Sequence, residues 1–170
     1  MQRSKKYGIK FAAASSLLTV GLLVIGWGSA AGVTAKSRTP GTPQPVRFYT
    51  DGQIIRPGTI IGTWHATGAI SDSGTYSELF RLDGTGTVTI HTEKTLTSAT
   101  GSIVLDANGI VEPISRTEVT FRAGAWEIHG TGAYATLHGH GTPAAEGTAN
   151  LATGVVHTLN TGSAHFDPAP

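Results

Sequence analysis

Histidine is the residue type whose spacing in this sequence best suggests chemistry. The chain has seven histidines, and His138 and His140 are two positions apart, so on a strand both would point to one face. His129 lies on the preceding predicted strand and could join them, and three imidazoles could hold zinc or copper. The alternative is that all three face solvent, because Ile128 and Leu137 on the opposite face are the core-like residues. We favour the surface interpretation and expect no metal or other cofactor.

A carboxylate and an imidazole also share a face in this region. Glu127 and His129 are two residues apart, Glu118 lies on the strand before them, and such a pair can transfer protons. At this spacing the pair is more often part of the surface. The sequence has no Gly-x-Ser-x-Gly motif, and no helix follows Gly84-Thr85-Gly86 to make it a phosphate loop. We therefore assign no catalytic residue and lean against an enzyme.

Five aromatic residues are the candidates for lining a ligand cavity. In a small barrel such side chains can simply fill the core, or they can surround an apolar or aromatic ligand. Strand alternation is compatible with both arrangements, so the pattern does not distinguish a filled core from a ligand cavity. The candidates are Trp64, Phe80, Phe121, Trp126 and Tyr134.

The elements that position these residues are predicted to be short β-strands. Apolar residues alternate with period two between Gly, Asp and Asn turn residues, and no stretch has the spacing of an amphipathic helix. We count seven or eight strands, with turns at Asp83-Gly84, at Asp106–Gly109 and around Gly124. They cover residues 60–67, 76–82, 87–92, 102–105, 119–121, 126–128, 134–138 and 154–161, with 162–166 as a further candidate.

Two architectures fit this spacing. One is an antiparallel β-sandwich and the other is a closed up-and-down barrel. A barrel has no exposed sheet edge at which chains could associate. The pattern alone does not separate the two.

The most distinctive stretch is residues 130–142, with the sequence GTGAYATLHGHGT. Its first two glycines permit a tight bend, and either Tyr134 or Leu137 can anchor the next strand, since strict alternation would not let both point inward. The stretch resembles the glycine-rich hairpin of the allene oxide cyclase barrel superfamily, which includes plant allene oxide cyclases, plant dirigent proteins and secreted bacterial families. Residues 154–167, which end in His-Phe-Asp, are similar to the bacterial members.

This resemblance covers residues 58–167 and implies an eight-stranded antiparallel barrel related in shape to lipocalins. It moves our expectation from the sandwich to the barrel. Plant members guide cyclisation or radical coupling inside an apolar cavity. None of their functional polar residues can be matched to positions here, so the resemblance transfers no catalytic residue.

The charge of the chain changes once its N-terminus is set aside. Four of the 12 lysines and arginines precede residue 36 and none of the 11 acidic residues does, so the overall charge of +1 becomes −3 for the remainder. That sum argues against binding to nucleic acid or to an anionic membrane surface. The chain has no cysteine, so disulfides, thiol nucleophiles and cysteine-based zinc sites are excluded.

The N-terminus has the pattern of a secretory signal. Arg3, Lys5, Lys6 and Lys10 precede an apolar run over residues 11–25, and Val33-Thr34-Ala35 has the small side chains of a cleavage site. We predict a signal peptide over 1–35, a flexible Pro-rich leader over 36–45 and a single barrel domain over 46–167. The alternative is an uncleaved anchor, because residues 11–33 are long enough to span a bilayer.

These features predict a secreted or extracytoplasmic barrel, and the absence of Asn-x-Ser/Thr sequons favours a bacterial source. We expect it to bind a small hydrophobic ligand or to act as an extracellular or envelope interaction module. One alternative is an isomerase or cyclase that works by positioning its substrate. Another is a purely structural surface protein.

Overall fold

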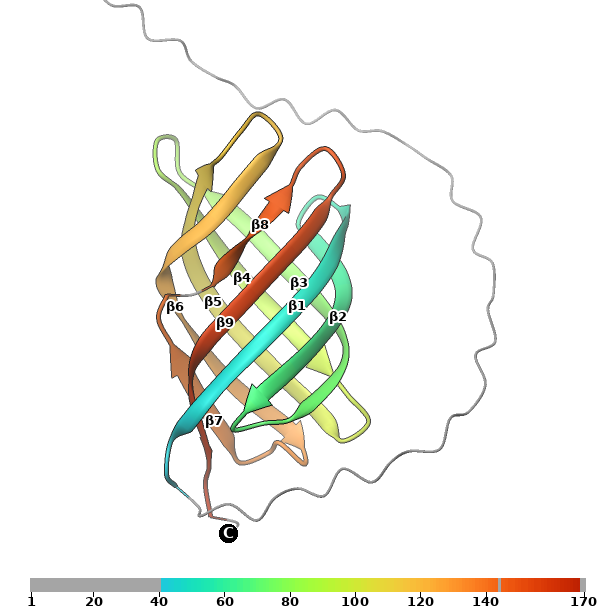
Figure 1. Cartoon of the computed structure of the whole chain (residues 1–170), viewed down its shortest axis with the longest axis vertical. Helices are drawn as coiled ribbons and strands as arrows, with labels where there is room; N and C mark the ends of the chain where they lie inside the picture. The colour runs from blue at the N-terminus through green and yellow to red at the C-terminus, as the bar shows by residue number, and fades with distance from the viewer. Residues whose placement is uncertain (1–40, 144, 169–170) are drawn as a thin grey trace, which may run out of the picture. The chain divides into compact units, whose positions relative to one another are not determined.

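The structure, a computed structural model, describes residues 41–143 and 145–168, which form a closed antiparallel β-barrel (Figure 1). Strands β1 to β6 pair in chain order, and β9 pairs with β1 to close the sheet. The nine strands are β1 (Gln44–Arg56), β2 (Thr59–Gly68), β3 (Asp72–Asp83), β4 (Val88–Thr97), β5 (Gly101–Pro113), β6 (Glu118–Gly132), β7 (Leu137–Gly141), β8 (Glu146–Asn150) and β9 (Val155–Phe166). The predicted signal peptide and residues 36–40 of the predicted leader lie outside the described residues, and the last two leader residues, Gln44 and Pro45, already belong to β1.

Two of the nine strands share one position in the barrel. Both β7 and β8 lie between β6 and β9: β7 pairs with residues 126–129 and 163–166, and β8 pairs with residues 118–121 and 156–159. The wall therefore has eight positions, and the seventh is filled by two short strands in line. The expected eight-stranded antiparallel barrel is confirmed. No helix among the described residues is long and apolar enough to cross a membrane.

Two predicted turns are instead parts of long strands. β5 runs through Asp106–Gly109, and β6 runs through Gly124. The register between the two strands shifts at this point, where Ala123 and Gly124 both have positive φ angles of 57° and 81°. These features are those of a β-bulge, which bends a strand without ending it. Turn-forming residues here mark the bulge, so the predicted turns were wrong.

The first strand was missed by the sequence analysis, although β1 alternates clearly. Val46, Phe48 and Thr50 are buried, whereas Arg47 and Asp51 on the opposite face are exposed. The candidate strand over 162–166 is also not separate, because it continues β9.

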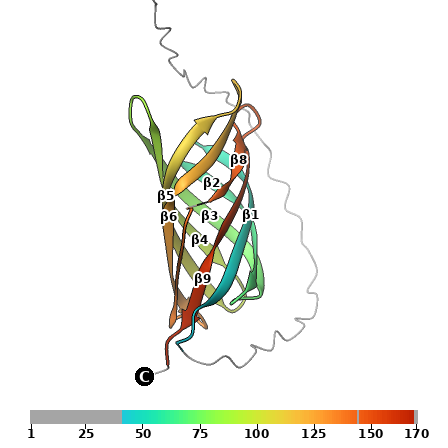
Figure 2. The ribbon, with the colours of Figure 1, turned by 60° about the vertical axis from the view of Figure 1, so that its left-hand side comes forward.

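The two ends of the barrel differ, and we name them the closed end and the hairpin end. Loops 69–71, 98–100 and 133–136 lie at the closed end, and they bury Ala69, Ile70 and Tyr134 in the core. Hairpin turns 57–58, 84–87, 114–117 and 151–154 lie at the hairpin end and contribute no buried residue. The strands tilt steeply between the two ends (Figure 2).

Tyr134 and Leu137 are both buried, contrary to the alternation argument. Tyr134 lies in the turn that precedes β7, so strand alternation does not apply to it. The turn is held by backbone hydrogen bonds from Tyr134 to Thr131 and from Leu137 to Tyr134, of 3.1 and 2.9 Å. The turn therefore adds an aromatic ring to the core that a regular strand could not.

Aromatic rings fill the half of the barrel next to the closed end. Phe48 contacts Trp64 and Trp126, with ring centroids 6.4 and 5.9 Å apart. The two indole nitrogens donate to the backbone carbonyls of Thr97 and Thr161, each at 3.2 Å. Burial of three large rings with satisfied indoles is a major source of stability in so small a barrel.

Glycines make room for one of these indoles. A β-carbon at Gly141 or Gly162 would overlap the ring of Trp126. Gly139, the next inward position of β7, is also a glycine, and a β-carbon there would approach Ile128 and Ala164. The glycine-rich composition of this part of the sequence thus reflects packing around the ring.

We expect Gly141→Ala to destabilise the barrel by about 1–3 kcal/mol, because the added methyl group would overlap both the Thr161 carbonyl and the Trp126 ring in a packed core. Gly86→Ala is the matched control: nothing lies within 4 Å of a β-carbon there, and we expect a change within about 0.5 kcal/mol. Urea unfolding of both variants measures this. Equal stability of the two variants would contradict the packing role.

Candidate functional site

The barrel interior contains a buried ion pair. Glu78 of β3 and Lys94 of β4 face each other directly across the two strands, and their side chains are only 4% and 3% exposed. Lys94 Nζ lies 3.7 Å from Glu78 Oε2. Acidic and basic residues are rarely buried so fully without a specific reason.

Lys94 also connects opposite walls of the barrel. Its ammonium group donates a hydrogen bond of 2.8 Å to Thr158 Oγ1 on β9, which is four positions from β4 in either direction around the eight-position wall. Thr158 Oγ1 in turn lies 2.5 Å from Thr50 Oγ1 on β1. Glu78, Lys94, Thr158 and Thr50 therefore form a polar chain across the interior, which we call the cross-barrel chain.

Three buried polar atoms beside the cross-barrel chain lack a hydrogen bond among the described residues. They are Glu78 Oε2, Thr92 Oγ1 and the hydroxyl of Tyr76, which lies near Thr50 without forming a regular hydrogen bond with it. Buried polar atoms are nearly always hydrogen-bonded, so unsatisfied ones point to a missing partner such as water or a ligand. Because three such atoms lie close together, we take this region as the candidate site.

The electrostatics of the cluster follow from burial. Burial raises the pKa of Glu78 above its ordinary value, and the nearby Lys94 ammonium only partly offsets the effect. Burial also raises the pKa of the Tyr76 hydroxyl, and the charge of Glu78 adds to this. Both groups are therefore weaker acids than they would be in water, and the protonated Tyr76 hydroxyl can donate a hydrogen bond inside the barrel.

Strand parity in the sequence places both members of this pair inside the barrel. Period-two alternation over residues 76–82 puts Glu78 on the same face as Tyr76 and Phe80. Lys94 has the same parity as Val88 and Ile90, but the predicted strand over 87–92 ends two residues before it. Extending the alternation by two residues would have placed Lys94 inside.

The five cavity candidates divide between the two halves of the barrel. Trp64, Trp126 and Tyr134 are buried near the closed end, where neighbouring side chains cover nearly all of their surface. Phe80 and Phe121 are half-buried on the hairpin side of the ion pair and pack against the core with other apolar residues. Of the five candidates, therefore, only Phe80 and Phe121 keep apolar surface that a ligand could cover.

Tyr134 takes part in a polar network that seals the closed end. Its hydroxyl donates to the carboxylate of Asp72, which also accepts a hydrogen bond of 2.7 Å from Thr100. Burial raises the pKa of Asp72, but hydrogen bonds outweigh burial and hold this pKa below its ordinary value; their donors are Ser98, Tyr134, Thr100 and the Ser73 amide. The network ties together two loops of the closed end and the start of β3.

The histidine candidates lie on the outer wall. His129 faces His138 directly across β6 and β7, and His140 faces Glu127. Among the described residues, no three His, Asp or Glu side chains are placed to hold a metal ion. His138 instead lies 3.3 Å from Asp167, which also contacts His165 at 3.3 Å. Glu118 lies at the start of β6, opposite Asn150, away from both His129 and Glu127.

A hollow of about 560 Å³ lies over β2, β3 and β4. It is open, and of its lining residues only Tyr76 also belongs to the candidate site. No charged group is part of its lining, which consists of Ile61, Gly62, Thr63, Thr75, Tyr76, Ser77, Thr95 and Thr97.

No protein-family model, curated protein or solved structure matches this chain. The resemblance to the allene oxide cyclase barrel superfamily therefore depends on the quoted motifs alone. It stays a prediction, whereas the barrel is established by the strand pairing.

We expect the stability of the protein relative to Glu78→Gln to decrease as pH rises. Glu78 has a raised pKa in the folded state, so its contribution is fully present below its ordinary pKa of 4.5 and is lost as pH rises through the folded value. Urea unfolding of both proteins at a series of pH values between 4 and 9 measures this difference. A constant difference across this range would show that the Glu78 carboxyl is not perturbed.

Replacing one member of the ion pair should destabilise the protein more than replacing both. Lys94→Met leaves the Glu78 carboxylate without a partner, and we expect a loss of about 3–5 kcal/mol, whereas the double variant Glu78→Leu, Lys94→Met should be close to wild type or more stable. Exposed Glu93→Gln on the same strand is the control. A double variant as unstable as the single one would show that the pair itself holds the barrel together.

Proposed function

We propose that the chain is an exported β-barrel that binds a small, largely apolar ligand carrying one polar group. The ligand would enter from the hairpin end, lie against the half-buried apolar residues there and direct its polar group at the Glu78–Lys94 pair. The single observation that carries this proposal is the buried ion pair with unsatisfied polar atoms beside it.

The energetics of the pair support a binding role. Burying two charges costs desolvation energy that their attraction often does not recover, so apolar side chains of similar size would serve stability at least as well. The pair is therefore better explained by recognition of something else. Ligand pockets commonly combine apolar walls with a few convergent polar groups.

The apolar residues on the hairpin side of the pair supply such walls. They point inward from β1, β3, β5 and β6 and are only half-buried, in contrast to the fully covered rings near the closed end. A ligand placed on them would cover apolar surface that is now partly in contact with water. These residues are Ile54, Phe80, Ala107, Val119 and Phe121.

A second candidate is an isomerase or cyclase of the type that the resemblance implies. The raised pKa of Glu78 favours it, since a neutral carboxyl group beside a lysine can act as a general acid on a bound substrate. The plant members of the superfamily also work inside a barrel. Positioning of a reactive substrate would supply the rest of the rate.

Native mass spectrometry of the protein purified from its own host tests the binding proposal. We expect a retained small molecule in the wild type and in Glu93→Gln, and its loss from the double variant Glu78→Leu, Lys94→Met, which should remain folded. Wild-type protein without a bound molecule, and unable to bind the fluorescent fatty acid parinaric acid, would favour the structural surface protein. Conversion of the released compound into an isomer of equal mass but different retention time would favour the enzyme.

A further inference from the structure

The turns of the hairpin end carry exposed aliphatic side chains. Each of its four hairpins has one in its turn or within two residues of it: Ile55, Leu82, Ile114 and Leu151, with exposed fractions of 52%, 45%, 56% and 41%. Because the strands alternate in direction, all four hairpins project from the same end of the barrel (Figure 1). Exposed apolar side chains are ordinary when scattered, but their grouping at one end indicates a contact surface.

Exposed aliphatic side chains are rare on the rest of the barrel surface. Only two further large apolar side chains are strongly exposed among the described residues, Ile61 and Leu79. Both lie on the outer wall near the β1–β2 hairpin, since Leu79 faces Thr59 and Ile61 is two residues beyond Thr59. The closed half of the barrel has no such side chain in the part of the chain that the structure describes.

Arginines are concentrated at the same end. Residues 41–168 contain five arginines, and all but Arg47 lie in or near the hairpins of this end. Three are close in sequence to an exposed aliphatic residue: Arg56 follows Ile55, Arg81 precedes Leu82, and Arg116 is two residues after Ile114. The fourth is Arg122 of β6.

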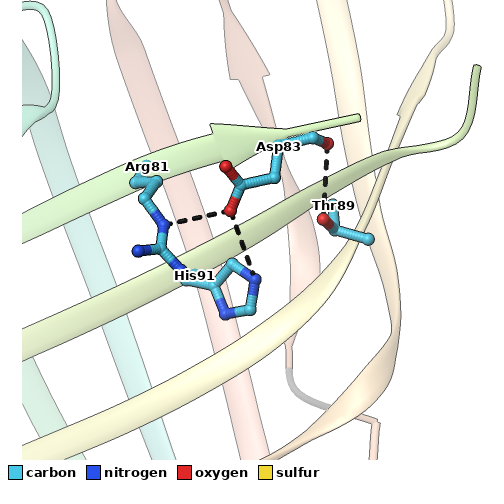
Figure 3. A network of polar contacts seen from close by, with 4 residues as sticks. All are labelled: Arg81, Asp83, Thr89 and His91. Carbon is cyan, nitrogen blue, oxygen red and sulfur yellow. Dashed lines mark hydrogen bonds and ion pairs between the residues drawn. The ribbon is translucent and has the colours of Figure 1, made fainter. Parts of the chain in front are cut away.

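Two of these arginines are free of acidic partners. Arg81 binds Asp83 at 3.0 Å, and Asp83 is held in addition by His91 at 3.5 Å, while Thr89 donates to its backbone carbonyl (Figure 3). Arg122 likewise pairs with Glu112. Arg56 and Arg116 form no ion pair with any described residue, and the remaining acid near the hairpin turns, Glu118, is half-buried at the base of β6.

We propose that the hairpin end docks on an anionic lipid bilayer. The aliphatic side chains at the four turns would enter the interfacial region, while Arg56 and Arg116 contact lipid phosphates. Arginine suits this position because its planar guanidinium binds phosphate with two hydrogen bonds and its aliphatic stem tolerates apolar surroundings. Separate aliphatic tips flanked by arginines match the layered chemistry of a membrane surface, where lipid phosphates lie above the acyl chains.

The net charge of −3 does not oppose this arrangement. The expectation against an anionic membrane surface considered only the sum of charges, and most acidic residues lie on the walls and at the closed end. Attraction to a charged surface falls off within a Debye length of about 10 Å. The charges at the hairpin end therefore determine whether the barrel is attracted to the membrane. The proposal does not depend on ligand binding.

A fluorophore at one turn tests the orientation directly. The chain has no cysteine, so Ser115→Cys in the full chain can be labelled at a single site with an environment-sensitive nitrobenzoxadiazole group. We expect vesicles of phosphatidylglycerol and phosphatidylcholine to shift its emission to shorter wavelength. The same label at Ala135→Cys, in an exposed turn of the closed end, should not shift. No shift at Ser115, or an equal shift at both positions, would overturn the proposal.

Charge-removing variants test the role of the arginines by the same emission shift at position 115. We expect Arg56→Gln with Arg116→Gln to weaken vesicle binding by about tenfold or more, given the contribution of each cation near an anionic surface. Arg47→Gln, near the closed end, is the matched control and should bind like wild type. Equal binding of the double variant and this control would overturn the assignment of Arg56 and Arg116.

Discussion

Pairing of β1 with β9 is the interaction on which the rest of the structure depends. Before it forms, the strands make an open sheet whose apolar face is exposed to water. Once it forms, every second residue points into a space with little access to water. Phe48, Lys94 and Thr158 become interior residues only because the sheet closes. Contacts between β4 and β9, which are far apart in any open sheet, then become available.

Closure also separates two kinds of interior. Near the closed end, large rings meet and buried loop residues cover them, so that half contributes stability. Towards the hairpin end, the cross-barrel chain replaces apolar packing, and the apolar residues above it stay partly exposed. The half of the barrel that holds the candidate site is thus the half in which polar side chains interrupt the apolar packing.

Period-two alternation made much of this predictable from the sequence. It placed Trp64, Phe80 and Trp126 on inward faces, and the glycine-rich motif favoured a barrel over a sandwich. Alternation failed where the backbone leaves the regular strand, at the bulge of Ala123 and Gly124 and in the turn that buries Tyr134. Turn-forming residues look alike in both settings, because local conformation does not reveal whether the strand continues beyond it.

The candidate site was predictable only in part. Parity alone could have placed Glu78 and Lys94 inside, since both have inward-facing neighbours two residues away. That Lys94 reaches Thr158 could not be predicted, because which walls face each other depends on strand number and stagger. The arginines and aliphatic residues of the hairpin turns come together for the same reason: antiparallel connectivity places alternate turns at one end.

The positions of the first and last strands have a practical consequence. Because β1 and β9 are neighbours, the barrel begins and finishes at the closed end, where the Gly41 amide donates to the carbonyl of Phe166. A short linker could therefore join the two ends, and new termini could be opened in an exposed turn without removing any strand. The fold is in this sense a suitable scaffold for circular permutation, with its hairpin turns available for grafted peptides.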